Sequence, residues 1–124
     1  MSLADIPLFS ALSQKLAWLG QRQQLLAQNV ANADTPGYTP KDLKETDFLA
    51  LAQQAAESGP STKPSAPFEI EHFPDTHETS LNGNSVNLEQ QLFKVAQTGS
   101  NFQLMTSLYR KHIDMLKLAL GRGA

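Results

Sequence analysis

The chain contains no cysteine, and its 124 residues include no long run of apolar residues. The absence of cysteine excludes disulfides, thiolate nucleophiles and zinc sites with cysteine ligands. No segment approaches the ~20 apolar residues that a membrane-spanning helix requires. The first residues also lack the basic start and the unbroken apolar run of a secretory signal peptide. We therefore expect a soluble chain made in the cytoplasm, for which any export would use another route.

The charge of the chain is small and evenly spread. Ten basic and twelve acidic residues give a formal net charge of −2. No run of five or more Lys or Arg residues occurs, so a nucleic-acid partner is not expected. A chain of this length fits one domain at most, and we expect residues 1–124 to form it.

Residues 8–32 have the apolar spacing of an amphipathic helix. Apolar residues recur at intervals of three and four, which places them on one stripe. Pro7 suits the first helical turn, where its missing N–H costs nothing. Trp18 and Leu25 lie off the stripe, so a second face is also partly apolar. The stripe consists of Phe9, Leu12, Leu16, Leu19, Leu26 and Val30. The polar face opposite holds Gln14, Lys15, Gln21, Arg22 and Gln28.

Residues 87–120 repeat this pattern over a greater length. A helix of this size spans roughly 50 Å, which exceeds the width of a small domain. Asn87 is suited to cap its start, and Gly99 predicts either a kink or the close approach of another backbone. Two apolar rows predict more than one packing partner. The first row is Leu88, Leu92, Val95, Phe102, Tyr109, Ile113, Leu116 and Leu120, and the second is Met105, Leu108, Met115 and Ala119.

The middle of the chain, residues 33–86, reads as a loop-rich insertion between the two helices. Residues 47–57 predict a short helix, and the alternation at 68–73 allows a short strand. Residues 58–82 have the Pro- and Ser-rich composition of a linker over their first half. The predicted fold class is therefore mainly α, with a short helix and a small β element in the middle.

Only one segment carries residues suited to catalysis. In residues 71–78 (EHFPDTHE), two histidines and an aspartate are potential metal ligands, and the glutamates are potential acid–base groups. The spacing matches no metal motif, so a solvated acidic loop is the favoured interpretation. His112 is interpreted as a helix-surface residue. We predict no catalytic residue, no metal and no cofactor. The ligand candidates are His72, Asp75 and His77, and the acid–base candidates are Glu71 and Glu78.

A tight turn is predicted where the first helix ends. Pro36 presets φ at the first corner of a type II turn, and Gly37 tolerates the positive φ at the second. Because Pro36 disfavours helical geometry at the preceding residue, the helix should end near residues 32–34. The amides of Asn29 and Asn32 can bond to backbone groups freed at this end.

The same segment resembles a known family. Its ten residues are similar to the N-terminal signature of the flagellar rod and hook family, which follows an amphipathic helix. The block at 82–96 (NGNSVNLEQQLFKVA) and residues 103–120 also resemble the start and end of that family's C-terminal helix. The similarity covers roughly residues 8–50 and 82–120. The signature residues are Asn29, Val30, Ala31, Asn32, Ala33, Asp34, Thr35, Pro36, Gly37 and Tyr38.

The resemblance implies a structural subunit of the proximal flagellar rod. In that family the terminal helices pair as an antiparallel, coiled-coil-like hairpin, and the pairs assemble into the axial drive shaft. The implied partners are copies of the chain, other rod proteins, the hook–basal-body adaptor protein and the type III export gate. The implied location is the periplasmic basal body, reached without a cleaved signal peptide. The expected assembly residues are Leu12, Leu16, Leu19, Leu26 and Val30 with the first apolar row of 87–120, Met105 and Leu108.

Two other functions stay open on the sequence. A self-contained helical adaptor that binds one soluble protein partner would use the same amphipathic helices. A metal-dependent enzyme would depend on His72, Asp75 and His77, and replacing both histidines would abolish its activity.

Overall fold

The computed structural model describes residues 7–58, 68–72, 83–84 and 86–121. Within them the chain is mainly helical. The elements in order are α1 (Pro7–Ala31), β1 (Lys41–Leu43), α2 (Phe48–Ser58), β2 (Ile70–His72) and α3 (Leu88–Ala119). Most of the predicted linker lies outside the described residues. The predicted short helix and short strand are confirmed as α2 and β2.

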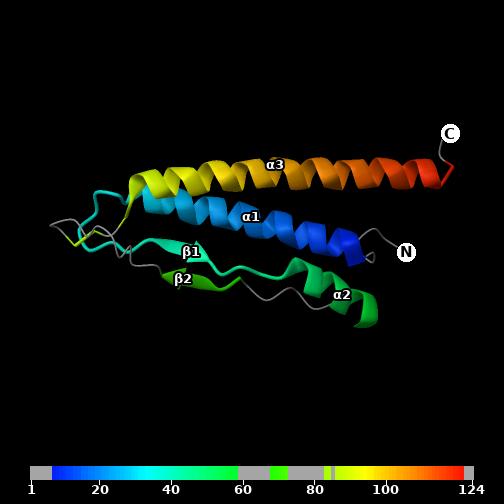
Figure 1. Ribbon diagram of the computed structural model, residues 1–124, viewed down its shortest axis with the longest axis horizontal. Coiled ribbons are helices and arrows are strands. Elements are labelled where there is room, and N and C mark those ends of the chain that lie inside the picture. Colours follow the sequence, from blue (N-terminus) through cyan, green and yellow to red (C-terminus); the bar gives the residue numbers. More distant parts are fainter. Residues whose placement is uncertain (1–6, 59–67, 73–82, 85, 122–124) are drawn as a thin grey trace.

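The two long helices lie side by side along the molecule (Figure 1). The ring of Phe9, near the start of α1, packs edge-on against Tyr109 in the second half of α3. Asn29, near the end of α1, is hydrogen-bonded to Gln91 in the first turn of α3. In Figure 1, α3 continues past the beginning of α1 at the right of the picture.

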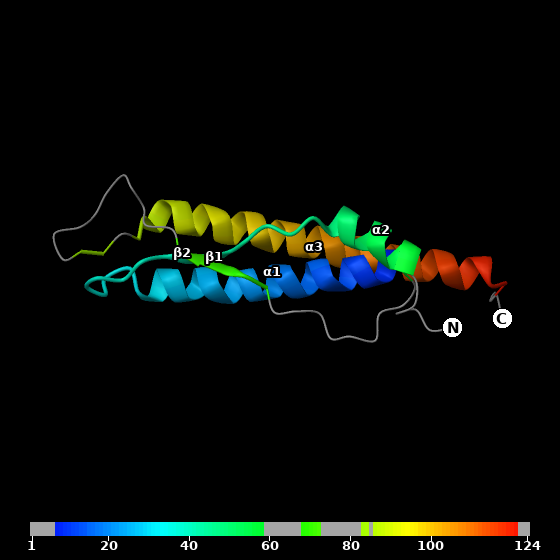
Figure 2. The ribbon, with the colours of Figure 1, turned by 90° about the horizontal axis from the view of Figure 1, so that it is seen from below.

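Helix α1 is the central element of the described structure. It contacts α3, α2 and β1, whereas α1 is the only described element that α3 contacts through neighbouring backbones. Figure 2 shows β1, β2 and α2 together on one side of the pair formed by α1 and α3. Most of the surface of α3 therefore has no covering element in the described part of the chain.

Both apolar faces of α1 are used. Leu19 and Leu26 from the predicted stripe are fully buried. Trp18 and Leu25, which lie off the stripe, join Leu19 and Leu43 of β1 in the core cluster. Three partly buried hydrophobic residues pack against this cluster, from α2, from the segment just before β2 and from α3: Phe48, Phe68 and Met105. The off-stripe face that the sequence indicated thus holds the middle segment against α1.

Lys15 and Arg22, which lie on the polar face opposite the stripe, contact aromatic rings. The Lys15 Nζ atom lies 4.8 Å from the ring centroid of Trp18 and 4.8 Å from that of Phe48. The Arg22 guanidinium carbon lies 5.4 Å from the Trp18 centroid. Because a cation is attracted to an aromatic face, both basic side chains turn toward Trp18 rather than toward solvent.

Strands β1 and β2, which precede and follow α2 in the chain, pair as a two-stranded antiparallel sheet. Lys41 pairs with His72 and Leu43 pairs with Ile70. The Trp18 indole N–H donates to the Lys44 carbonyl just after β1, at 3.0 Å. An isolated pair of strands is marginally stable, and this anchoring to α1 supplies the packing that it needs.

Helix α3 is capped at its start and continuous along its length. The side chain of Asn87 accepts a hydrogen bond from the Gln90 N–H, as predicted for the cap. The helix is continuous through Gly99, and a Cβ built at Gly99 meets nothing within 4 Å. No described segment of the chain therefore approaches this glycine closely, and the helix is not broken there.

This geometry gives a stability prediction for Gly99→Ala. Alanine avoids the backbone entropy cost of a helical glycine, and the added methyl group has open space, so the isolated chain should gain about 1 kcal/mol. Urea denaturation followed by circular dichroism at 222 nm measures the change. An unchanged or lower stability would show that the site is crowded or not helical.

Candidate functional site

A buried asparagine near the end of α1 organises the junction of four segments. Asn29 is fully buried. Its amide N–H groups donate to the Lys41 carbonyl at 2.7 Å and to the Gln91 side-chain oxygen at 2.9 Å. Its oxygen accepts from the Tyr38 hydroxyl at 2.9 Å and from the Lys41 N–H at 3.0 Å. All four hydrogen-bonding positions of the amide are used, so α1, the following turn, β1 and α3 are joined by one side chain.

The predicted turn is present. Helix α1 ends at Ala31, one residue before the predicted range. The Tyr38 N–H donates to the Thr35 carbonyl at 3.3 Å, and Gly37 has φ of +74°, as a type II turn requires at that corner. The Asn32 amide donates to the Gln28 carbonyl at 2.8 Å, and the Thr35 hydroxyl donates to the Asn32 side-chain oxygen. Both predicted asparagines thus bond to groups at the helix end.

The turn receives a partner from far along the chain. Asn84 is buried, and its amide donates to the Asn32 carbonyl at 2.8 Å and to the Thr35 carbonyl at 2.6 Å. Its oxygen accepts from the Val86 N–H. Gly83 has φ of +78°, and a Cβ there would lie 3.7 Å from the Gly37 backbone. The two segments that carry the family resemblance therefore contact each other directly.

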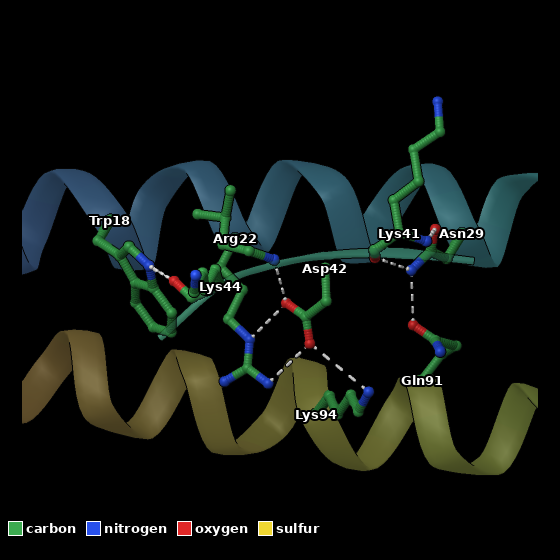
Figure 3. A network of polar contacts seen from close by, with 9 residues as sticks. Trp18, Arg22, Asn29, Lys41, Asp42, Lys44, Gln91 and Lys94 are labelled. Carbon is green, nitrogen blue, oxygen red and sulfur yellow. Dashed lines mark hydrogen bonds and ion pairs between the residues drawn. The ribbon is translucent and has the colours of Figure 1, made fainter. Parts of the chain in front are cut away.

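A buried carboxylate ties β1 to both long helices (Figure 3). Asp42 receives two hydrogen bonds from the Arg22 guanidinium of α1, at 2.9 and 3.1 Å. The Lys94 ammonium group of α3 lies 3.5 Å from the second carboxylate oxygen. The Leu43 N–H also donates to Asp42. One acid thus pairs with two cations from two helices, which fixes how β1, α1 and α3 sit relative to one another.

Burial also affects the phenol that contacts Asn29. Desolvation raises the pKa of Tyr38 above its ordinary value of 10.0. The Tyr38 phenol therefore remains neutral and able to donate its hydrogen bond to Asn29 throughout the physiological pH range.

A prediction for the turn follows from the φ of Gly37. Alanine at residue 37 should destabilise the chain by about 1–2 kcal/mol, because φ is positive there although no atom lies within 4 Å of the added Cβ. Gly20→Ala, in the open middle of α1, is the matched control and should instead stabilise by about 0.5–1 kcal/mol. Thermal melts of the two variants test the opposite signs.

The predicted packing residues of α1 and α3 behave differently. Those of α1 are buried or half-buried. On α3 the residues most deeply buried are Gln91 and Thr98, which lie between the predicted rows. The first predicted row is therefore only partly covered by α1. Its half-buried members are Val95, Tyr109, Ile113 and Leu116, and its exposed members are Leu88, Leu92, Phe102 and Leu120.

Large apolar residues are also exposed on the far side of α3. Phe93, Leu104, Met115 and Leu118 are 54–76% exposed. At about 100° per residue they lie roughly 100–160° around the helix from Thr98, which is fully buried. A row of this size on a folded chain is typical of a protein-binding surface. Phe93, Leu104 and Leu118 were in neither predicted row.

The candidate metal-binding segment lies mostly outside the described residues, which end at His72 before resuming at Gly83. His72 is exposed at the end of β2. His112 is half-buried, with its ring centroid 6.4 Å from that of Phe9. In the part of the chain that the structure describes, no three acidic or histidine residues are grouped so as to hold a metal ion. None of the described helices has the length and hydropathy of a membrane span.

Sequence reasoning missed the residues that complete the polar network. Asp42 and Asn84 lie in segments without a periodic signal, and Gln91 is a polar residue outside the apolar rows of its helix, so nothing in the sequence indicates that they are buried. In the sequence, residues 82–84 read Asn-Gly-Asn, a combination that favours turns. This is the only local signal that could have identified Asn84 as part of the turn region.

The chain is similar to known flagellar proteins. A family model described as "Flagella basal body rod protein" matches residues 10–39. Flagellar basal body rod protein FlgB of Agrobacterium fabrum is 30% identical, with 98% of each chain covered. FlgB of Escherichia coli K12 is 31% identical, over 83% of this chain and 85% of the relative. FlgB of Proteus mirabilis HI4320 is 25% identical, over 93% and 94%.

Proposed function

Because the chain belongs to the FlgB family of flagellar basal-body rod proteins, we propose that α1 and α3 form an antiparallel, coiled-coil-like hairpin through which it assembles into the proximal rod. The chain is a structural subunit of the rod and not an enzyme. Residues 1–124 act as one axial domain, in which 33–86 are an insertion between the two helices.

The exposed apolar surface of α3 carries this proposal. Helix α3 has 32 residues, and the described part of the chain covers one side of it. Burying a large apolar side chain contributes about 1.5–3 kcal/mol. The exposed leucine, phenylalanine and methionine residues of α3 therefore favour association with neighbouring subunits. A monomeric adaptor with one partner would leave part of this surface in water.

The hydrogen bonds and ion pairs of Asn29 and Asp42 define the shape of the subunit and do not themselves bind neighbouring subunits. Asn29 and Asp42 fix the register of α1 against α3, and the turn with Gly37 fixes where the chain leaves α1. Side chains that each satisfy several partners rigidify a structure. A subunit of a rod that transmits torque needs this defined shape, because loosely paired helices would deform under load.

The remaining assignments follow the family. We infer that the partners are copies of the chain, other rod proteins, the hook–basal-body adaptor protein and the export gate on the MS-ring side. The chain reaches the periplasmic part of the basal body through the flagellar type III apparatus, without a cleaved signal peptide. The absence of any disulfide or cysteine is compatible with passage in an unfolded state.

Thiol bridging in isolated basal bodies tests the proposed hairpin. The Gln23 amide lies 3.5 Å from the Val95 carbonyl, and the chain has no native cysteine. In a Gln23→Cys/Val95→Cys variant, a short thiol-bridging reagent should link α1 to α3 within one chain, giving a monomer that migrates faster on a denaturing gel. The matched control Gln28→Cys/Val95→Cys has its α1 cysteine on an exposed position and should not bridge.

Two results would count against the proposal. Absence of the chain from the basal-body fraction would remove the rod assignment. Bridging between different chains by the Gln23→Cys/Val95→Cys pair, with none inside a chain, would show that α1 and α3 pair between subunits instead.

A further inference from the structure

The outward row of α3 ends in a stretch that is both apolar and basic. Leu104, Met115 and Leu118 are exposed, and Lys111 lies among them on the same side of the helix at about 100° per residue. Between residues 110 and 117 the helix carries three basic residues, Arg110, Lys111 and Lys117, against one acidic residue, Asp114.

Helix α2 presents the opposite combination. Leu49 is 70% exposed, and Gln53, Ala56 and Glu57 follow it on one exposed side of the short helix. Residues 45–57 contain Glu45, Asp47 and Glu57, all exposed, and no Lys or Arg. The outward side of α2 therefore combines one exposed leucine with one acidic residue, Glu57, and two further acids precede the helix.

The two surfaces match in length as well as in charge. From Leu49 to Glu57 is eight residues, about 12 Å of helix, and from Lys111 to Leu118 is seven residues, about 10 Å. The distance between Leu49 and Glu57 along α2 is thus close to the distance between Leu118 and Lys111 along α3. Helix α2 packs on α1 and not on α3, so one chain offers both surfaces at separate places.

Resting on the proposed self-assembly, we infer that the α2 surface of one copy (Leu49 and Glu57) docks on the α3 surface of the next (Lys111, Met115 and Leu118). The contact joins two different surfaces of identical chains. Such a heterologous contact does not close into a symmetric dimer and instead propagates, as a ring or a helical assembly. Opposite charges set the register, and the leucines and Met115 supply the apolar contact.

Cysteine trapping in isolated basal bodies tests the contact. Two tagged chains, Leu49→Cys and Leu118→Cys, are expressed together in a flagellated host that lacks the natural copy, and mild oxidant is applied. We expect a dimer that contains one chain of each kind. The double variant Leu49→Cys/Leu118→Cys should give a ladder of multimers, and Leu118→Cys alone should give none. Gln24→Cys, exposed on α1, replaces Leu49→Cys as the control.

Charge reversal gives a second, independent readout. Lys111→Glu and Glu57→Lys should each lower the yield of the cross-linked dimer about tenfold, because like charges then face each other. Mixing the two single variants restores opposite charges at each contact between unlike variants, so the yield of dimers that contain one of each should return. No gain on mixing would overturn the proposed pairing.

The outcomes separate this inference from the proposed function. If wild-type chains are present in basal bodies but Leu118→Cys links only to itself, to another protein or to nothing, the docking of α2 on α3 is wrong and the rod assignment stands. If the wild-type chain is absent from basal bodies, both are wrong.

Discussion

Replacing Asn29 by leucine is expected to lower the free energy of unfolding by about 3 kcal/mol or more. Leucine has nearly the same size but none of the four hydrogen bonds that the Asn29 amide makes with Lys41, Gln91 and Tyr38. The Gln91 side chain, which is 2% exposed, then loses its partner and cannot be solvated. A loss of this size is a large fraction of the stability of a small domain.

Urea denaturation of Asn29→Leu, followed by circular dichroism, measures this change. Gln28→Leu is the matched control, since it makes the same kind of replacement one residue earlier at an exposed position, and it should change stability by less than about 0.5 kcal/mol. Similar effects from the two variants would mean that the buried amide does not fix the junction of α1, β1 and α3.

The second large effect is expected for Asp42→Ala. Removing this carboxylate leaves Arg22 and Lys94 facing each other in a mostly buried position, with side chains 14% and 24% exposed. Breaking a buried ion pair by removing one partner costs about 3–5 kcal/mol. The repulsion between the two cations should loosen α3 from α1 as well as from β1, and the thermal midpoint should fall clearly.

The surface pair Lys44–Glu69 supplies the control. These side chains are 57% and 75% exposed and 3.3 Å apart, so Glu69→Ala should cost less than about 1 kcal/mol. Replacing Arg22, Asp42 and Lys94 together by Met, Leu and Met should recover much of the loss, since apolar residues can substitute for a buried network of ion pairs. Equal effects of Asp42→Ala and Glu69→Ala would contradict the role assigned to Asp42.

The periodicity of apolar residues predicted the helices of this chain well, because a helix that buries one face carries apolar residues at regular intervals in the sequence. The sequence predicted the apolar stripe of α1 and its second apolar face at Trp18 and Leu25. It also predicted the helix cap at Asn87. The type II turn at Gly37 was readable for a different reason, since proline followed by glycine restricts φ at both corners.

The polar contacts were not readable because they depend on which residues meet in space. Gln91 and Asp42 look like ordinary surface residues in the sequence, and each becomes buried only when α1 lies against α3 and β1. For the same reason, the side of α3 that faces α1 is centred on Gln91 and Thr98 and not on the most apolar row. Gln91 and Thr98 are buried against α1, whereas leucines and phenylalanines of α3 stay exposed.

Electron microscopy of basal bodies shows whether the rod depends on this chain. The gene is deleted in a flagellated host, and either the wild type or a Pro36→Ala/Gly37→Val variant is restored. A rod subunit predicts rings without rod or hook after deletion, full structures with the wild type, and few or none with the turn variant. Normal rods in the deletion strain would contradict the role as a rod subunit and would favour a helical adaptor with a soluble partner.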